Sequence, residues 1–224
     1  MYNILITGHR NGLGAALYMA LALEHHVIGY DILDGFDVCD PQIDGLDCIG
    51  LDILINCAGV NRIDWIEKFE ESDWDGVMDV NAKGIFMMVK ATLPLLIQSK
   101  GTVVNIVSNA AHMPMTCSTA YNASKAAAHI MTQQMARELT KKYGITVFGI
   151  APNKLAGTEM SKYIEGRVTE TRGWSAAQAA EYQRSALLTG EETSVEAVAD
   201  FVAFLLSSKQ RHKFLSGCVI PYGA

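Results

Sequence analysis

The chain has 224 residues, of which half are apolar and 19% are charged, and its formal net charge at pH 7 is −6. This length suits one domain with a sizeable core, and the acidic balance argues against a nucleic-acid-binding surface, because phosphates need a basic face. With no run of 18 apolar residues and no signal-peptide pattern at Met1, the composition excludes disordered, collagen-like, secreted disulfide-rich and membrane-spanning proteins.

Cysteine and histidine usage indicates neither a disulfide framework nor a metal site. The cysteines are odd in number and show no CxxC pair or zinc spacing. Reduced thiols in a cytoplasmic protein are the simplest interpretation. The six histidines have no metal-ligand spacing with carboxylates nearby, so no metal site is expected. The cysteines are Cys39, Cys48, Cys57, Cys117 and Cys218.

Short β-branched runs alternate with longer helical stretches, a pattern typical of a parallel sheet with crossover helices. Strands are expected at residues 2–7, 27–30, 51–57, 102–107, 145–150 and 218–222. Helices are expected at residues 15–24, from a cap at Ser72 or Asp73 toward residue 99 with a bend at Pro94, at 121–143 with Gly144 as C-cap, and at 195–208. Without repeats or linkers, residues 1–224 are predicted to form a single doubly wound α/β domain of Rossmann type with a mostly parallel sheet.

Residues 32–50 depart from this alternation. A parallel crossover needs a dozen or more residues, and only residues 32–35 separate the second strand region from Phe36. Asp34 and Gly35 predict a tight turn, so residues 36–38 form either an antiparallel strand or no sheet strand at all. Crossover helices between residues 32 and 50 are therefore expected to be missing or shortened, which leaves one sheet edge poorly covered.

A glycine-rich turn joins the first strand to the first helix, where residues 7–14 read Thr-Gly-His-Arg-Asn-Gly-Leu-Gly. Glycines let the backbone approach a pyrophosphate, and the helix N-terminus adds free N–H groups and a positive dipole end. The spacing is G-x-x-x-G-x-G rather than G-x-G-x-x-G, and an ordinary β-to-α turn that needs positive φ is the alternative. The expected cofactor contacts are Gly8, Arg10, Asn11, Gly12, Leu13 and Gly14.

Tyr121 and Lys125 are four residues apart at the start of a predicted helix, which puts them on one face. An ammonium beside the phenol is expected to lower the tyrosine pKa from its ordinary value of about 10. Such a tyrosine can exchange a proton with an alcohol or ketone oxygen, and Ser108, at the end of a strand, could hold that oxygen. By itself such a pair is more often an ordinary surface pair on a helix.

These motifs, taken in chain order, resemble those of the classical short-chain dehydrogenase/reductase (SDR) family over nearly the whole chain. Its T-G-x-x-x-G-x-G matches residues 7–14, and its N-N-A-G matches residues 56–59 with Cys57 as the one change. Its catalytic asparagine, serine and Y-x-x-x-K match Asn81, Ser108, Tyr121 and Lys125.

The resemblance implies a role for each matching residue. Tyr121 would be the general acid/base, and Lys125 would bind the nicotinamide ribose and tune the tyrosine. Ser108 would orient the carbonyl, and Asn81 would hold a water in a proton relay. The residues implied on the adenosine side are Asn56, Ala58, Gly59, Asp37 and Val38. Pro152 matches the family's P-G with an asparagine following it, Thr158 would touch the carboxamide, and residues 156–190 would form a substrate lid.

The cofactor is expected to be NAD or NADP. Asp31 follows the second strand, where a carboxylate can accept hydrogen bonds from the adenosine ribose hydroxyls and repel a 2′-phosphate. Arg10 favours NADP, because its guanidinium could pair with that phosphate. A fixed carboxylate should outweigh a flexible arginine, so NAD is the predicted choice.

The sequence thus predicts an NAD(P)-dependent oxidoreductase that interconverts a secondary alcohol and a ketone. The alternative is a non-catalytic dinucleotide-binding regulatory protein of the same fold. A sugar-nucleotide epimerase is disfavoured, because about 70 residues after Pro152 are too few for its substrate domain. The expected partners are a small-molecule substrate and further copies of the chain in a dimer or tetramer, with neither nucleic acid nor membrane.

Overall fold

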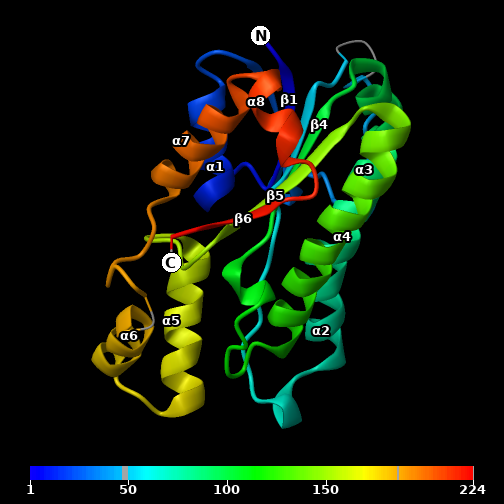
Figure 1. The fold of residues 1–224 in the computed structure, drawn as a ribbon. Coiled ribbons are helices and arrows are strands. Elements are labelled where there is room, and N and C mark those ends of the chain that lie inside the picture. Colours follow the sequence, from blue (N-terminus) through cyan, green and yellow to red (C-terminus); the bar gives the residue numbers. More distant parts are fainter. Residues whose placement is uncertain (47–49, 186, 224) are drawn as a thin grey trace.

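The computed structural model describes residues 1–46, 50–185 and 187–223. Within them, six strands form one sheet in the order β2-β1-β3-β4-β5-β6, and every neighbouring pair is parallel (Figure 1). The strands are β1 (Asn3–Thr7), β2 (His26–Tyr30), β3 (Ile53–Asn56), β4 (Thr102–Ile106), β5 (Thr146–Pro152) and β6 (Val219–Tyr222). The predicted α/β fold class and all six expected strands are confirmed.

Helices cover both faces of the sheet (Figure 1). On one face, α1 and α7 pack on each other through residues such as Leu17 and Val202, which are fully buried. On the other face, α3 and α4 share a core that includes Met88 and Leu139. The helices are α1 (Gly12–Leu21), α2 (Glu71–Met78), α3 (Gly84–Ser99), α4 (Thr119–Tyr143), α5 (Glu159–Arg172), α6 (Ala176–Ser185), α7 (Val195–Leu206) and α8 (Lys209–His212).

The helix ends test the capping predictions. Gly144 ends α4 with a φ of 74°, as expected of a glycine C-cap. The prediction that Ser72 or Asp73 caps a helix is wrong, because α2 already begins at Glu71. The backbone N–H groups of Asp73 and Trp74 both donate to the carbonyl of Glu70, so the N-cap is Glu70, two residues before Ser72.

The stretch from Glu71 to Ser99 changes its hydrogen bonding at Asp79–Lys83, a π-helical turn between α2 and α3, and Pro94 lies inside α3. Turns of this kind are frequent at functional sites. By length and composition, Glu71–Ser99 is the one stretch of the described residues that could cross a membrane. Half of its most apolar window is buried in the domain. A core helix of a globular protein has the same length and apolar composition.

The connection from β2 to β3 has no α-helix in the residues described, as predicted. Residues Ile32–Asp34 form a 3₁₀ turn that ends at Gly35 with a φ of 86°, and residues 36–38 are not in a strand. The Tyr30 hydroxyl holds the following loop by donating to the carbonyl of Asp37 at 3.4 Å and accepting from the N–H of Gln42 at 2.8 Å. The loop thus packs at the end of β2 instead of continuing the sheet.

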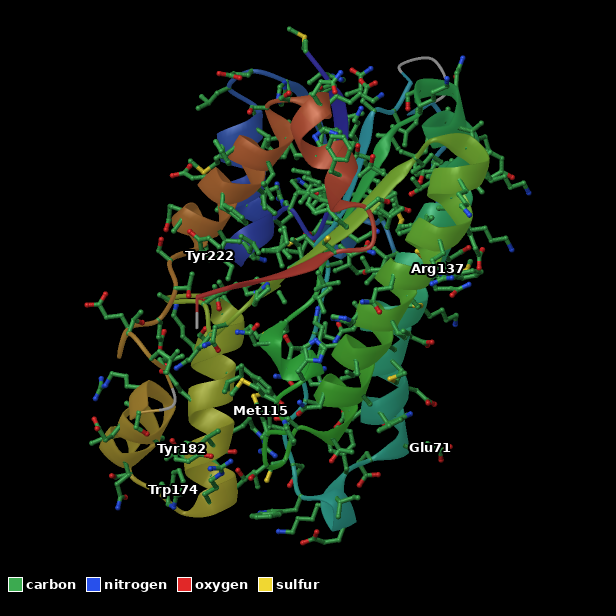
Figure 2. All side chains as sticks on the ribbon, in the orientation of Figure 1. Glu71, Met115, Arg137, Trp174, Tyr182 and Tyr222 are labelled. Atoms are coloured by element: carbon green, nitrogen blue, oxygen red, sulfur yellow. The ribbon has the colours of Figure 1, made fainter. Side chains whose placement is uncertain are left out.

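Residues 156–190 contain α5 and α6, which extend beyond the carboxyl ends of the strands (Figure 1), and their role as a substrate lid stays a prediction. Trp174 packs inside this region, with its ring 5.1 Å from that of Tyr182 and the Arg172 guanidinium 4.8 Å from its centre (Figure 2).

The four described cysteines are free thiols, and Cys48 lies outside the described residues.

Candidate active site

The glycine-rich turn has the backbone that a pyrophosphate cradle needs. Gly8 and Gly12 have φ values of 70° and 52°, a region that favours glycine. A Cβ at Gly14 would overlap the carbonyl oxygen of Gly8, and a Cβ at Gly8 would lie 2.8 Å from the Cα of Ala58. Positive φ at Gly8 and Gly12 and close packing at Gly8 and Gly14 therefore favour glycine at these three positions.

The N-terminus of α1 is open to an anion. Its N-cap, Asn11, makes no side-chain hydrogen bond to the helix, and the first turn holds no acidic residue. Leu13 points into the core, so only its backbone faces the turn. Free N–H groups at the positive end of a helix dipole fit a pyrophosphate, and these residues therefore suit a dinucleotide.

Asp31 fastens the turn to the end of β2. Its carboxylate accepts the backbone N–H of Arg10 and that of Leu33, each at 3.0 Å, and the residue is 8% exposed. A carboxylate has about four acceptor positions, so Asp31 retains lone pairs for a ribose hydroxyl.

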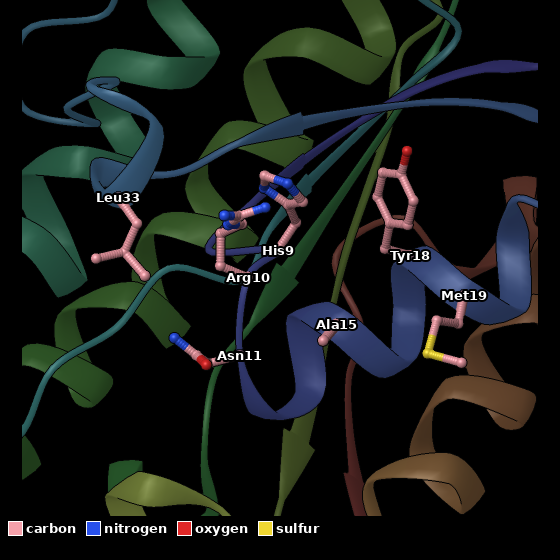
Figure 3. Close-up of a pocket in the computed structure, with 7 residues that line it drawn as sticks. All are labelled: His9, Arg10, Asn11, Ala15, Tyr18, Met19 and Leu33. Carbon is pink, nitrogen blue, oxygen red and sulfur yellow. The ribbon is translucent and has the colours of Figure 1, made fainter.

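Arg10 is turned toward a second carboxylate. Its Nε lies 3.5 Å from Asp34, and His9 Nε2 lies 3.5 Å from the other oxygen of the same group. A cavity of about 500 Å³ opens beside them, lined also by Asn11, Tyr18 and Leu33 among others (Figure 3). Sequence reasoning missed Asp34 as the partner that engages Arg10.

The segment expected to contact adenine is anchored locally. Asp37 accepts the N–H of Cys39 at 2.8 Å through its own side chain, and Val38 is buried against Gly84, where a Cβ would lie 2.7 Å from the valine methyl. Asp37 is exposed. Adenine contact by these residues stays a prediction.

Thr7 joins the turn to the end of β3. Its hydroxyl accepts the backbone N–H groups of Cys57 and Ala58, each at 3.0 Å. Asn56 donates to the side chain of Asn105 at 2.8 Å, inside the sheet. Residues 56–59 thus end a buried strand at the glycine-rich turn, and Thr7 contributes to this junction although the sequence analysis did not list it as a site residue.

Asn81, in the π turn, fixes the backbone beside the site. Its Oδ1 accepts the N–H of Val60 at 2.8 Å, and its Nδ2 donates to the Val60 carbonyl at 2.9 Å and to the Ser124 hydroxyl at 3.0 Å. A Cβ at Gly59 would lie 3.3 Å from Oδ1 of Asn81 and 3.7 Å from Nζ of Lys125. Asn81 is thus a positioning residue here, and its part in a water relay stays a prediction.

Ser108, Tyr121 and Lys125 are brought together as predicted. The Lys125 Nζ lies 5.7 Å from the centre of the Tyr121 ring and donates to the carbonyl of Ile106 at 3.0 Å. The Ser108 side chain hydrogen-bonds Tyr121, and its hydroxyl also accepts the N–H of Ala110 at 3.1 Å. The first turn of α4 and the end of β4 therefore place the side chains of Ser108, Tyr121 and Lys125 close together.

The expected lowering of the Tyr121 pKa is wrong for the ligand-free chain. Burial raises the pKa of Tyr121, and the hydrogen bond from Ser108 only partly opposes this. The pKa of Lys125 is lowered to about 8, chiefly by burial, with the Cys57 thiol opposing. Burial disfavours both the phenolate and the ammonium, so it outweighs the attraction inferred from their spacing.

The remaining predicted contacts lie around the turn. Pro152 ends β5, and the N–H of Asn153 donates to the Tyr222 carbonyl at 2.9 Å. The Thr158 methyl lies 3.5 Å from where a Cβ of Gly12 would be, while its hydroxyl caps α5 by accepting the N–H of Ser161 at 3.0 Å. Thr158 therefore faces the glycine-rich turn, and its contact with a carboxamide stays a prediction.

Among the described residues, no three His, Cys, Asp or Glu side chains could hold a metal ion.

Replacing Lys125 with Met tests this electrostatic picture. Its pKa is about 8 in the folded chain against an ordinary 10.5, so the unfolded chain binds more protons between these values. Below pH 8 Lys125 is protonated in both states, so burying its ammonium lowers the free energy of unfolding by the full amount. As pH rises to 10.5 the side chain becomes neutral in both states, and this destabilisation disappears. We expect Lys125→Met to be more stable than the parent at pH 7, on the order of 3 kcal/mol.

Urea unfolding of both proteins from pH 7 to 10.5 measures this difference. Subtracting the two curves removes titrations that they share, and the thiol of Cys57, whose pKa burial raises to about 12, stays protonated in the folded chain over this window. The stability difference should shrink steadily from pH 8 to 10.5. A difference that stays constant over this window would contradict the lowered pKa.

Comparisons with known proteins found a matching family and several similar sequences. The sequence profile of the short chain dehydrogenase family matches residues 46–168. An uncharacterized oxidoreductase of Staphylococcus aureus (strain MRSA252) is 41% identical over 104 residues, 46% of this chain and 45% of that protein. One from Staphylococcus epidermidis is 37% identical over 128 residues, 56% of this chain and 55% of that protein. The chain thus aligns with about half the length of these relatives.

Solved structures match nearly the whole chain. A putative 2-deoxy-D-gluconate 3-dehydrogenase from Agrobacterium tumefaciens with bound NADP is 26% identical with a TM-score of 0.84, over 99% of this chain and 94% of that one. An NAD⁺-bound xylitol dehydrogenase is 22% identical with a TM-score of 0.89, over 99% and 97% of the two chains. The second likeness concerns the fold alone.

Proposed function

Since the chain belongs to the short-chain dehydrogenase family of oxidoreductases, we propose that it interconverts a secondary alcohol and a ketone with a nicotinamide dinucleotide. The observation that carries this proposal is the convergence of Ser108, Tyr121 and Lys125 beside an open helix N-terminus. A bound nicotinamide dinucleotide supplies or accepts the hydride. The protein must then hold the substrate oxygen and move one proton.

In the direction of reduction, Tyr121 donates its phenolic proton to the substrate oxygen, while Ser108 hydrogen-bonds the same oxygen. The raised pKa of Tyr121 keeps it protonated at neutral pH, which suits an acid. Lys125, within reach of the tyrosine ring, stabilises the phenolate that remains. Asn81 keeps the segment at Val60 fixed beside them.

The test is a panel of ketones and alcohols assayed with NAD(H) and NADP(H) by absorbance of the reduced nicotinamide. Turnover of a secondary alcohol or its ketone is expected. The second candidate, a dinucleotide-binding protein without catalysis, would bind the cofactor and turn over nothing in the panel.

For the cofactor we propose NAD, supported by two observations. The Asp31 carboxylate is fixed by two backbone N–H groups beside the turn, where it would repel a 2′-phosphate. The Arg10 guanidinium, which could attract that phosphate, is beside Asp34. We expect the parent to have a higher kcat/KM with NAD.

Two isosteric variants test this choice. Asp34→Asn releases Arg10 and should raise kcat/KM with NADP about three- to tenfold. Asp31→Asn keeps an oxygen acceptor and removes the charge, so it should move the NADP-to-NAD ratio in the same direction. Asp44→Asn, at an exposed carboxylate, is the control for net charge. A parent that prefers NADP, or a ratio that neither variant moves, would refute the assignment.

We further propose a homo-oligomer, a dimer or tetramer built on the long helices. Phe86 of α3 and Ile130 of α4 support it, since they are 48% and 59% exposed and large apolar side chains on a surface favour association.

A further inference from the structure

The loop between β4 and α4 separates Ser108 from Tyr121 in sequence. It begins with the 3₁₀ turn Asn109–Ala111 and continues to the N-terminus of α4. Its side chains at Met113 and Met115 are 51% and 43% exposed, and the second of them is labelled in Figure 2. The distance between the hydroxyls of Ser108 and Tyr121 therefore depends on how this surface loop is held against α4.

The side-chain amide of Asn122, the residue after Tyr121, holds this loop. Its Nδ2 donates to the carbonyl of Ala110 at 2.5 Å and to that of Met113 at 2.7 Å. Its Oδ1 accepts the backbone N–H of Met115 at 3.3 Å. An amide nitrogen has two hydrogens to donate, so both are used on the loop. Two carbonyls and one N–H as partners are satisfied together by this orientation of the amide.

Ala110 connects the Asn122 amide to Ser108. The Ser108 hydroxyl accepts the N–H of Ala110 at 3.1 Å, and the carbonyl of the same alanine accepts from Asn122. Ala110 lies in the 3₁₀ turn and is 6% exposed, so it has little room to shift. The serine hydroxyl and the residue next to Tyr121 are thus joined through one buried alanine.

A second contact between the loop and α4 lies farther from the site. Nε2 of His112 is 3.0 Å from Nδ1 of His129, which lies about two helical turns beyond Tyr121. The hydrogen bond of this pair involves neither Ser108 nor Ala110. It allows the general order of the loop to be separated from the connection through Ala110.

We propose that Asn122 is a positioning residue, which holds the Ser108 hydroxyl where it and the Tyr121 hydroxyl reach the same substrate oxygen. This inference rests on the proposed function and adds a residue to it. Asn122 acts without touching the substrate, because both of its donors are used on the loop. A displacement of about 1 Å can cost about 100-fold in rate, so loss of the amide should lower kcat while cofactor binding persists.

A double-mutant cycle, with the ketone that the panel identifies as substrate, tests whether Asn122 acts through Ser108. Asn122→Ala should lower kcat by about 10- to 100-fold, and Ser108→Ala by about 100-fold or more. The double variant should be slower than Ser108→Ala by no more than about threefold, because Asn122 then has no serine hydroxyl to position. Losses that multiply in the double variant would mean that the two residues act independently, which overturns the inference.

His129→Ala is the matched control, since it releases the same loop without removing a contact of Ala110. It should keep kcat within about threefold of the parent. A loss equal to that of Asn122→Ala would show that the order of the loop as a whole sets the rate, and the inference would fail.

Cofactor affinity, measured by fluorescence titration, shows whether the site stays intact. Asn122→Ala is expected to fold, because alanine has the higher helix propensity. Asn122→Asp is a second variant with nearly the same shape, which keeps an oxygen for the Met115 N–H but lacks the amide donors for the two carbonyls. Both variants should lose kcat and retain the parental affinity. If both lose cofactor affinity as well, Asn122 is structural and the inference fails.

Failure of the proposed reaction looks different from failure of this inference. A parent that turns over nothing in the panel of ketones and alcohols defeats the proposed reaction, and the positioning role falls with it. Multiplying losses in an active parent overturn the role of Asn122 alone.

Discussion

Replacing Tyr121 with Phe is expected to lower kcat by about 100-fold or more, because the hydroxyl proposed to transfer the substrate proton is lost. The ring is retained, so the packing at the start of α4 and the Lys125 ammonium near its face persist. Cofactor affinity should therefore stay close to that of the parent. Steady-state turnover and a fluorescence titration with the reduced cofactor measure these two quantities separately.

The control is Tyr143→Phe, at the opposite end of the same helix. It removes the same hydroxyl outside the site and should retain parental turnover. Full activity of Tyr121→Phe would eliminate the proposed acid/base role. Loss of cofactor binding in that variant would instead show that Tyr121 contributes to the fold of the site.

Replacing Gly14 with Ala is expected to destabilise the protein by about 1–3 kcal/mol or more and to abolish cofactor binding. The new Cβ would overlap the Gly8 carbonyl oxygen and lie 2.7 Å from the Gly8 carbonyl carbon and 3.1 Å from the Cα of His9. These are backbone atoms, so relief requires the turn itself to move. The same movement displaces the N–H groups that would face a pyrophosphate.

Gly166→Ala is the matched control for this substitution. Gly166 lies inside α5, and a Cβ there meets nothing within 4 Å. Alanine should stabilise that helix by about 0.5–1 kcal/mol. Thermal unfolding and cofactor titration of both variants provide the comparison, and equal shifts in Tm would show that crowding at the turn is not the cause.

Local signals explain why the fold could be predicted from the sequence. The strands at residues 3–7 and 102–106 are short runs that are apolar or β-branched apart from Asn3 and Asn105, and the glycine at position 144 readily adopts the positive φ at which a helix ends. The four-residue spacing of Tyr121 and Lys125 fixes their common face in any helix. Residue identity and spacing along the chain suffice for such features.

The structure also corrected details within those elements. The N-terminus of α2 lies ahead of Ser72 because Glu70 accepts the first helical hydrogen bonds. The helix changes its bonding at the π turn around Asn81, where the side chain holds Val60. A helical pattern in sequence does not reveal such a turn, since the bonds that position it come from distant segments.

The properties that govern chemistry depended on tertiary structure. Whether the pKa of Tyr121 rises or falls depends on how much water surrounds it, and burial proved stronger than the lysine four residues away. Arg10 is beside Asp34 only because the shortened connection after β2 turns back toward the glycine-rich turn.

The side-chain amide of Asn61 also shows the difference between what the sequence determines and what the tertiary structure determines. In sequence this residue is an asparagine that follows Val60, and its residue type alone predicts a surface position. In the fold its side chain is buried, with no hydrogen-bond partner among the described residues. The sequence determined which chemical groups the protein carries and in what order, because these follow from local spacing. The tertiary structure decided which groups lose water and which find partners, because both depend on contacts between segments far apart in the chain.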